Sequence, residues 1–267
     1  MTNAPSPANL LAAMRREQPL VHCITNFVAM NVAANVLLAA GASPAMIHAE
    51  AEAGEFAAIA GALTVNIGTL SPDWLKGMQV AAQAATAAGR PWILDPVAHY
   101  ATTFRREATA SLLALSPTII RANASEIIAL AGSASRGRGV DSRDSVAAAE
   151  DAARLLAARH KSVVAVTGVT DFVTDGDRAV RIAGGSALMP QVTALGCALT
   201  CLVGAFAAVS PRDGFEAAVA ALAFYALAGE RAAVQADGPG SFAWRFLDAL
   251  AAVDEPALAA EARISPA

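Results

Sequence analysis

Short, uninterrupted apolar runs recur along the first two thirds of the chain. Each holds six or seven residues, and most are rich in isoleucine, valine or leucine. Strands of a parallel sheet are covered on both faces, so they show this continuous apolar character rather than strict alternation. The pattern therefore predicts buried parallel strands over residues 44–49, 63–68, 91–96, 117–123 and 162–168.

Longer stretches with helical periodicity separate these runs. Gly41 and Gly89 follow two of the stretches, at the position where glycine commonly ends a helix. Repeated alternation of strand and helix is typical of an α/β fold with a doubly wound sheet and right-handed crossovers. We expect helices over residues 29–40, 50–60, 72–88, 104–115, 124–131 and 145–159.

The pattern changes after residue 168. Residues 171–182 predict a hairpin, because the turn dipeptide Asp175-Gly176 separates two short apolar runs. From Gly196 onward the chain is predicted to be helical, over residues 196–209, 213–235 and 241–253.

One polar, Gly-rich segment, residues 132–145, interrupts the pattern between two predicted helices. Because helices continue on both sides, the segment is predicted to be an exposed loop rather than a domain boundary. A chain of 267 residues is long enough to form one large α/β domain with a sizeable core. We therefore expect a single domain over residues 1–267.

The composition excludes several classes of protein. The chain is 55% apolar and 16% charged, which excludes a disordered protein. Its net charge is -4 and its one dense basic patch is 136–139, so no nucleic-acid partner is expected. Apolar runs at 195–209 and 217–228 are shorter than the roughly 20 residues of a membrane span. The odd number of cysteines, three, and the lack of a recognisable secretory leader favour a reducing cytoplasm, where a disulfide framework is not expected.

Polar side chains follow four consecutive predicted strands. Ligands of open α/β sheets bind outside the C-terminal ends of the strands, so these side chains are expected to share one site. Helix capping is the alternative for Asn123 and Ser125, but capping does not account for Asp95 or Arg121. The polar and glycine residues at these ends are Asn66, Thr69, Asp95, Arg121, Asn123, Glu126, Thr167 and Gly168.

Asn123 and Glu126 are three residues apart and would share one face of a helix. Glu126 could hold a hydrated Mg²⁺, which proteins bind through one or two carboxylates together with substrate phosphates. The alternative is a helix cap followed by a surface glutamate. The chain has neither a Walker loop nor a dinucleotide-binding glycine fingerprint. A bound nucleotide would therefore depend on free N–H groups at the start of a helix.

Residues 193–197, Thr-Ala-Leu-Gly-Cys, precede a long apolar helix. Gly196 would let the backbone approach a ligand closely, and Thr193 is a candidate cap. The helix N-terminus is expected to lower the pKa of Cys197, which would make its thiol a better base or nucleophile. Cys201 lies one turn further into the apolar run and is predicted to be a core residue. A zinc site is disfavoured, because the histidines show no ligand spacing to these cysteines.

Two segments nearer the N-terminus also carry candidate chemistry. His22 and Cys23 are neighbours, but adjacent side chains on a strand face opposite sides and would not pair as in a thiol hydrolase. We predict that residues 21–26 form a loop that enters a helix. Met46 lies in a predicted strand, where methionine usually fills the core.

Taken together in chain order, these motifs resemble the hydroxyethylthiazole kinase family, a ribokinase-like family of thiamine biosynthesis and salvage. The resemblance extends from about residue 18 to residue 250, and the pair HCITN and GASPAM is specific to this family. The matching motifs are VHCITN, GASPAM, NIGTL, LDPV, RANASEI, VAVTG, the Gly-Cys pair that opens the late helix, and GPGSF.

The resemblance implies a ribokinase-like fold, with a mostly parallel central sheet and helices on both faces. It also implies ATP-dependent phosphorylation of the hydroxyl of 4-methyl-5-(2-hydroxyethyl)thiazole, with Mg²⁺ as cofactor. Members of the family are trimers with active sites between neighbouring subunits, so a homotrimer is expected.

The resemblance further assigns roles to individual residues. Met46 would lie on the thiazole, and Asn26 near the substrate alcohol. Cys197 would occupy the position where ribokinase relatives carry an aspartate base, and would act as a base or as an orienting group. The backbone N–H groups of Gly196 and Cys197 would bind the transferred phosphate. Arg121 and Thr167 would bind ATP. Glu126 and Asp95 would lie in the region that holds Mg²⁺ and the phosphates.

One departure from the family pattern affects the substrate loop. The family usually has a glycine that contacts the substrate where this chain has Ala194, and Leu195 adds bulk beside it. Positive φ at this position would cost alanine more than glycine. The segment 98–103 also differs from the usual small, Gly-rich sequence after the DPV motif.

Three other functions are compatible with the sequence. The first is a related kinase of a pyrimidine alcohol or a sugar. The second is a binding or regulatory protein that has lost catalysis, which the Ala194–Leu195 departure motivates. The third is a cysteine-dependent hydrolase or oxidoreductase, although no histidine is paired with Cys197 in the sequence.

Overall fold

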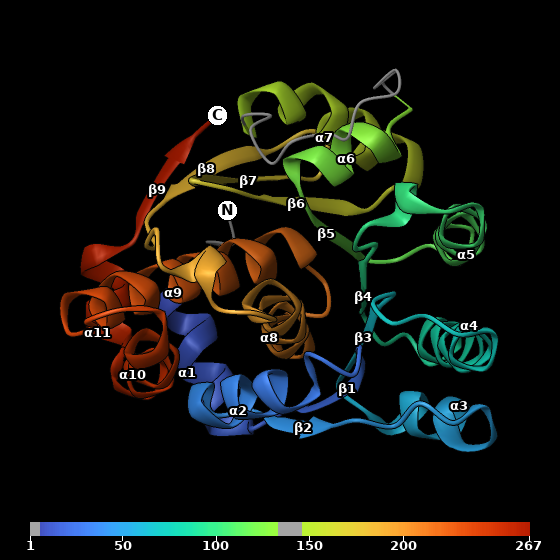
Figure 1. Cartoon of the computed structure of the whole chain (residues 1–267), viewed down its shortest axis with the longest axis horizontal. Coiled ribbons are helices and arrows are strands. Elements are labelled where there is room, and N and C mark those ends of the chain that lie inside the picture. Colours follow the sequence, from blue (N-terminus) through green and yellow to red (C-terminus); the bar gives the residue numbers. More distant parts are fainter. Residues whose placement is uncertain (1–5, 133–145) are drawn as a thin grey trace.

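One sheet forms the centre of the molecule in the computed structural model, which describes residues 6–132 and 146–267 (Figure 1). In these ranges its strands are β1 (Leu20–Ile24), β2 (Ser43–Ala45), β3 (Ala62–Asn66), β4 (Trp92–Asp95), β5 (Ile119–Asn123), β6 (Val163–Thr167), β7 (Thr170–Thr174), β8 (Ala179–Ala183) and β9 (Arg263–Pro266).

The strand order is β2-β1-β3-β4-β5-β6-β7-β8-β9. The strands from β2 to β6 run parallel, and β7, β8 and β9 each run antiparallel to the strand before them. The predicted α/β fold with a mostly parallel central sheet is confirmed.

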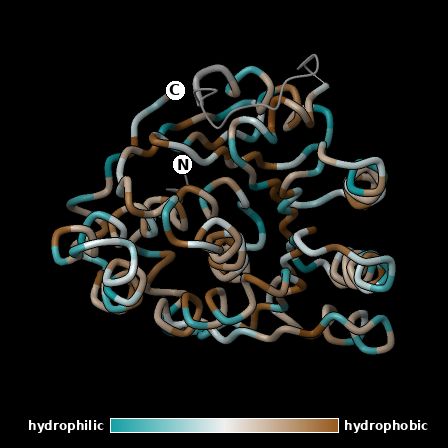
Figure 2. The backbone as a smooth tube through the Cα atoms, in the orientation of Figure 1, coloured by the Kyte–Doolittle hydropathy of each residue, from teal (hydrophilic) through white to brown (hydrophobic). Residues whose placement is uncertain are grey.

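Helices cover both faces of the sheet, and the hydropathy colouring shows brown along the strands between them (Figure 2). One face carries α1 (Pro7–Glu17), α2 (Met30–Ala40), α8 (Leu195–Val209), α9 (Gly214–Val234), α10 (Pro239–Ala252) and α11 (Glu255–Glu261). The other face carries α3 (Glu50–Ile59), α4 (Pro72–Ala87), α5 (Thr103–Leu113), α6 (Ala124–Leu130) and α7 (Val146–His160).

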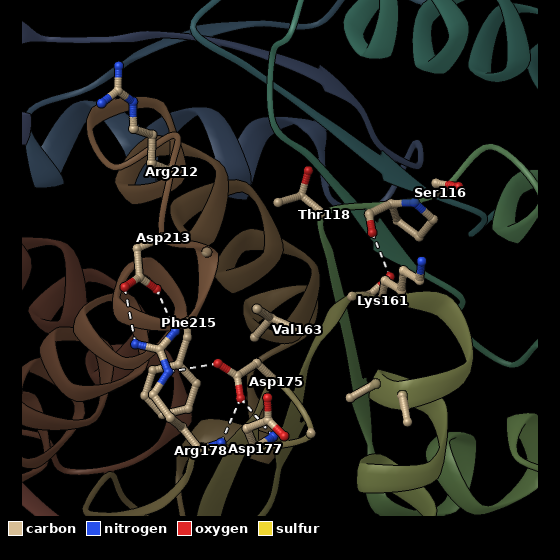
Figure 3. A pocket seen from close by; sticks show the side chains of 16 residues that line it. Ser116, Thr118, Lys161, Val163, Asp175, Asp177, Arg178, Arg212, Asp213 and Phe215 are labelled. Carbon is tan, nitrogen blue, oxygen red and sulfur yellow. Dashed lines mark hydrogen bonds and ion pairs between the residues drawn. The ribbon is translucent and has the colours of Figure 1, made fainter.

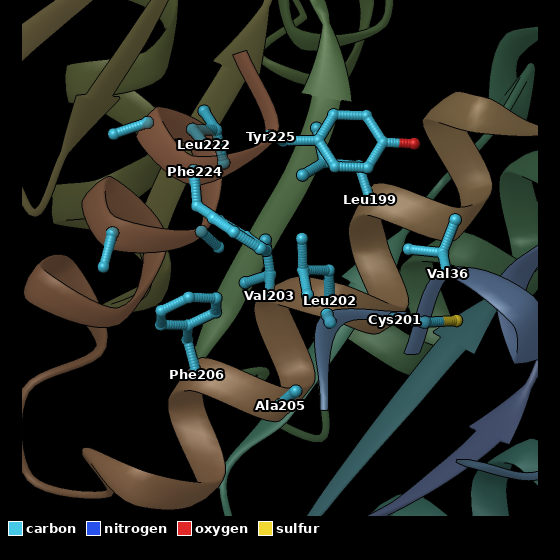
Figure 4. Close-up of a cluster of buried hydrophobic side chains, with 14 of the residues drawn as sticks. Val36, Leu199, Cys201, Leu202, Val203, Ala205, Phe206, Leu222, Phe224 and Tyr225 are labelled. Carbon is cyan, nitrogen blue, oxygen red and sulfur yellow. The ribbon is translucent and has the colours of Figure 1, made fainter. Parts of the chain in front are cut away.

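Helix α8 packs directly across β1, β3 and β4. Gly204 permits this close approach, because a Cβ atom there would lie 2.5 Å from Cγ2 of Thr64 on β3. Cys201 of the same helix is buried in the core, as predicted; its sulfur lies 3.5 Å from the Thr64 hydroxyl oxygen of β3, on the side of Val36 (Figure 4). The packing fixes the start of α8 above the C-terminal ends of the parallel strands.

Helix α9 has 21 residues and is apolar enough to cross a membrane by length and composition. It matches the helix predicted over 213–235, and it is longer than the apolar run at 217–228 from which the sequence argued against a membrane span. Most of its residues are buried against the sheet, α8 and α10. We therefore describe α9 as a core helix of the fold.

Several sequence predictions were wrong in detail. Residues 20–24 form β1 inside the sheet, not a loop, and the strand predicted over 44–49 shrinks to β2. The N-terminal helix α1 and the C-terminal α11 and β9 were not predicted. These segments are short or polar, so sheet pairing and packing decide their structure rather than local pattern. The predicted loop over 132–145 lies almost wholly outside the described residues.

Other local predictions are confirmed. Gly41 ends α2 with a φ of 105°, in the left-handed region that glycine tolerates. The hairpin over 171–182 forms from β7 and β8, with Gly176 in its turn. Asn123 caps α6 and Glu126 completes a capping box with it.

Candidate active site

Four polar side chains gather where the parallel strands end. Apolar residues at alternate positions of β3, β4, β5 and β6 pack under α3 to α7, which turns the intervening residues toward α8. The strand registers pair Asn66 with Asp95, and Asn123 with Thr167. As expected for a site at this edge, Asn66, Asp95, Arg121 and Thr167 therefore share one face.

Arg121 joins the ends of three strands. Its Nη1 lies 3.4 Å from Oδ2 of Asp95 on β4, and its Nη2 donates a hydrogen bond of 2.6 Å to Oγ1 of Thr167 on β6. Thr200 of α8 donates a 2.7 Å hydrogen bond to the same Asp95 oxygen. Burial raises the pKa of Asp95, while the Arg121 charge and the Thr200 hydroxyl oppose that rise.

Glu126 belongs to the same buried region rather than to the surface. Its Oε2 accepts the Asn123 N–H at 3.0 Å, and its Oε1 accepts the Ala98 N–H at 2.9 Å. Burial raises its pKa, and the negative charge of Asp95 raises it further. Two buried carboxylates that repel one another form an environment that a divalent cation would stabilise.

The described residues hold no group of three or more His, Cys, Asp or Glu that could ligate a metal. A site that needs four protein ligands, such as structural zinc, is therefore absent from this part of the chain. Mg²⁺ needs only one or two carboxylates with water and phosphate oxygens. Asp95 and Glu126 fit that requirement.

Gly196 lies in the first turn of α8, directly against Arg121. A Cβ atom at Gly196 would lie 3.3 Å from both Nη1 and Nη2 of the guanidinium. The first N–H groups of a helix have no acceptor within the helix. The positive end of α8 and a buried guanidinium therefore meet at one point, which is suited to an anion.

Cys197 follows Gly196, and its Sγ accepts a hydrogen bond of 3.4 Å from Nδ2 of Asn26. Its pKa is raised to about 11, first by burial and then by the charge of Asp95. The prediction that the helix N-terminus lowers this pKa was wrong. Desolvation and the Asp95 carboxylate both disfavour the thiolate, so the thiol stays protonated near neutral pH.

The loop before α8 contains the departure noted in the sequence. Ala194 is the N-cap residue with a φ of 66°, and no side chain, Thr193 included, caps the helix. Leu195 is buried in the core, and its carbonyl accepts a 2.8 Å hydrogen bond from the Tyr225 hydroxyl. The side chain of Leu195 therefore points into the core. The departure from the family pattern instead strains the backbone of Ala194, which has positive φ.

Asn26 reaches this site from the loop after β1. Its Nδ2 donates to Oδ1 of Asn66 at 2.9 Å, and a Cβ atom at Gly68 would lie 2.6 Å from the same nitrogen. Met46 follows β2 and is half-buried against the apolar cluster of α2 and α8. Nothing in the structure tests the thiazole contact expected of Met46, and that role stays a prediction.

Two residues of the site received no role from the sequence. Thr200 contacts Asp95, and its position three residues after Cys197 in an apolar helix was the available signal. Asn66 was recognised only as one of the polar residues at a strand end. In the segment 98–103, the Ala98 N–H binds Glu126 and Nε2 of His99 contacts the Glu126 carbonyl, so this segment supports the glutamate.

A cavity of about 630 Å³ lies at the opposite end of the strands (Figure 3). Ser116 and Lys161, which precede β5 and β6, contribute to its lining. Arg178 in the cavity wall is already paired with Asp175 and Asp213. None of the candidate site residues lines this cavity, so it is separate from the site described above.

Comparisons with known proteins agree on one family. Residues 11–256 match the model described as the hydroxyethylthiazole kinase family. The chain is 72% identical over 267 residues to a protein named hydroxyethylthiazole kinase from Rhizobium johnstonii, and the match covers 100% of both chains.

Solved structures give the same result. A hydroxyethylthiazole kinase protein from Pyrococcus horikoshii is 36% identical with a TM-score of 0.90, over 98% of both chains. Pyridoxal kinase from Staphylococcus aureus, solved with ADP, is 16% identical with a TM-score of 0.61. That match covers 79% of this chain and 87% of the other, and it supports the ribokinase-like fold alone.

We expect Ala194→Gly to leave the free energy of unfolding unchanged or to raise it by up to about 1 kcal/mol. Glycine removes the strain of an alanine backbone in the left-handed region, which stabilises the folded state. The greater conformational freedom of glycine in the unfolded chain offsets part of that stabilisation. Urea denaturation would measure the change. Ala110→Gly, at an exposed position inside α5, is the control and should lose about 1 kcal/mol. An equal loss in both variants would contradict the proposed backbone strain.

Proposed function

Because the chain belongs to the hydroxyethylthiazole kinase family, we propose that it phosphorylates the hydroxyl of 4-methyl-5-(2-hydroxyethyl)thiazole with ATP. The reaction would serve thiamine biosynthesis or salvage, in the cytoplasm. The observation that carries the proposal is the contact of Arg121 with the start of α8 at Gly196, where a γ-phosphate can be bound.

Phosphoryl transfer requires positioning and charge stabilisation more than covalent chemistry. Arg121 and the N–H groups of Gly196 and Cys197 surround one point with positive charge. As charge spreads over the phosphoryl oxygens in the transition state, these donors stabilise it without reorganising. Thr167 holds the guanidinium from β6 and lies beside the expected ATP phosphates.

Asp95 and Glu126 would hold Mg²⁺, which neutralises charge on the ATP phosphates when it is bound. Arg121 keeps Asp95 partly compensated, and backbone N–H groups fix both oxygens of Glu126. Thr200 orients Asp95 from α8. These contacts give both carboxylates fixed directions before a cation arrives.

Cys197 orients the substrate alcohol in this proposal rather than removing its proton. A thiol with a pKa of about 11 is almost entirely protonated at pH 7 and is a poor base in that form. Asn26 holds the sulfur in place through its side-chain amide. The thiazole ring would lie between Met46 and the backbone of Ala194.

We further propose that three copies of the chain associate, with active sites between neighbours. Phe27 and Val28 follow Asn26 directly and are 66% and 57% exposed, although both are large apolar residues. Apolar surface beside the site would be covered by a neighbouring copy. Light scattering should give a mass near three times the 27.0 kDa of one chain. A monomer at assay concentration would contradict the association.

The decisive experiment is phosphorylation of the thiazole alcohol by the purified protein with ATP and Mg²⁺. We expect formation of the thiazole phosphate and ADP in equal amounts. A pyrimidine alcohol and a sugar serve as alternative acceptors. Binding of thiazole and ATP without turnover would favour a protein that has lost catalysis, and phosphorylation of another acceptor alone would overturn the proposed substrate.

Cys197→Ala should lower kcat by about 10- to 100-fold, because an unoriented alcohol reacts more slowly. Its KM for the thiazole alcohol should change by less than about 3-fold, since the thiol contributes little to binding. Steady-state kinetics would separate the two effects. Cys201→Ala, one turn away in the core, is the control and should retain kcat while losing some stability. Equal losses in kcat and binding would argue against an orienting role.

A further inference from the structure

Asn66 lies at the end of β3, in register with Asp95 on β4, and only 2% of it is exposed. Its Oδ1 accepts two hydrogen bonds of 2.9 Å, from Nδ2 of Asn26 and from the N–H of Gly68. If the Asn66 amide were flipped, its NH₂ group would face the N–H groups of Asn26 and Gly68, and no hydrogen bond could form. The two bonds therefore fix which end of the Asn66 amide faces the site.

The other end of that amide makes no hydrogen bond of normal length. Nδ2 of Asn66 is buried and makes no hydrogen bond among the described residues. Leaving a buried N–H unsatisfied is destabilising, so such groups are rare and call for an explanation. The neighbouring donors of Asn26 and Gly68 are satisfied, so Nδ2 is the unpaired atom of this asparagine pair. Thr25 Oγ1 and Arg121 Nε are also buried without a partner in this region.

The unpaired N–H faces the reacting centre. Thr64, two residues earlier on the same face of β3, contacts Cys201 of α8, and Cys197 lies one turn nearer the helix start. Asn66 accordingly lies near Cys197 and Asp95, and its amide is directed at the thiol and the carboxylate, although no hydrogen bond of normal length joins Nδ2 to either group. Nδ2 therefore faces Cys197, the residue assigned to the alcohol, and Asp95, which contacts Arg121 of the phosphate site.

We propose that Asn66 is a further catalytic residue, whose Nδ2–H donates a hydrogen bond to the hydroxyl oxygen of the acceptor alcohol. This inference rests on the proposed function. With one lone pair of that oxygen held by Asn66, the other is directed at phosphorus. The amide is neutral, so it orients the nucleophile without the loss of reactivity that a cation would cause.

A double comparison of enzyme and ligand tests the contact. Binding of the thiazole alcohol and of 5-ethyl-4-methylthiazole, which lacks only the hydroxyl, is measured calorimetrically for the wild type and Asn66→Ala. We expect the wild type to bind the alcohol about 3- to 10-fold more tightly than the ethyl compound, and the variant to lose most of this preference. Its kcat should fall roughly 100-fold.

Asn66→Asp separates donation from a purely structural role. Aspartate keeps an oxygen for Asn26 and Gly68 and, when it is ionised at alkaline pH, has no donor. Under that condition it should also lose the preference for the alcohol. Thr64→Val, on the same strand face but away from the reacting groups, is the control and should keep it. A structural role alone predicts the wild-type preference in Asn66→Asp.

The outcomes distinguish this inference from the function on which it rests. If the wild type phosphorylates the alcohol but Asn66→Ala keeps the wild-type preference for the hydroxyl, the contact is overturned and the proposed function stands. If the wild type phosphorylates no thiazole alcohol, the proposed function fails and the contact fails with it.

Discussion

The buried ion pair between Arg121 and Asp95 is the interaction on which the rest of the site depends. Two charged groups inside an α/β core are tolerated only when each is compensated and hydrogen-bonded. Thr167 and Thr200 supply the additional hydrogen bonds, from β6 and from α8. The guanidinium in turn lies against Gly196, so the same pair links the strand ends to the start of the helix.

This arrangement depends on how tightly α8 packs on the sheet. Gly204 lies against Thr64 of β3, and a side chain there would push the helix outward. The helix start would then move away from Arg121, and the anion site would lose one of its two positive components. Core packing and phosphate chemistry are thus coupled through one helix, whose apolar part is structural and whose first turn is functional.

The local pattern of the chain predicted much of this organisation. Continuous apolar runs identified most of the parallel strands, and the chain placed Asp95, Arg121 and Thr167 at their ends, where a shared site was expected. Local pattern failed for β1 and β9, because these strands depend on pairing with neighbours rather than on their own sequence. It also failed for the pKa of Cys197, which depends on burial and on a carboxylate from a different strand.

The sequence by itself determined the fold class, the edge of the sheet that carries the site and the residues available there, because periodicity and residue order are local properties. Only the tertiary structure decided how those residues act. It raised the pKa of a thiol that its helix position alone would lower, and it held Ala194 at positive φ. It also left the buried side-chain nitrogen of Asn66 without a hydrogen bond of normal length. Each of these results from groups distant in sequence that desolvate or constrain one another.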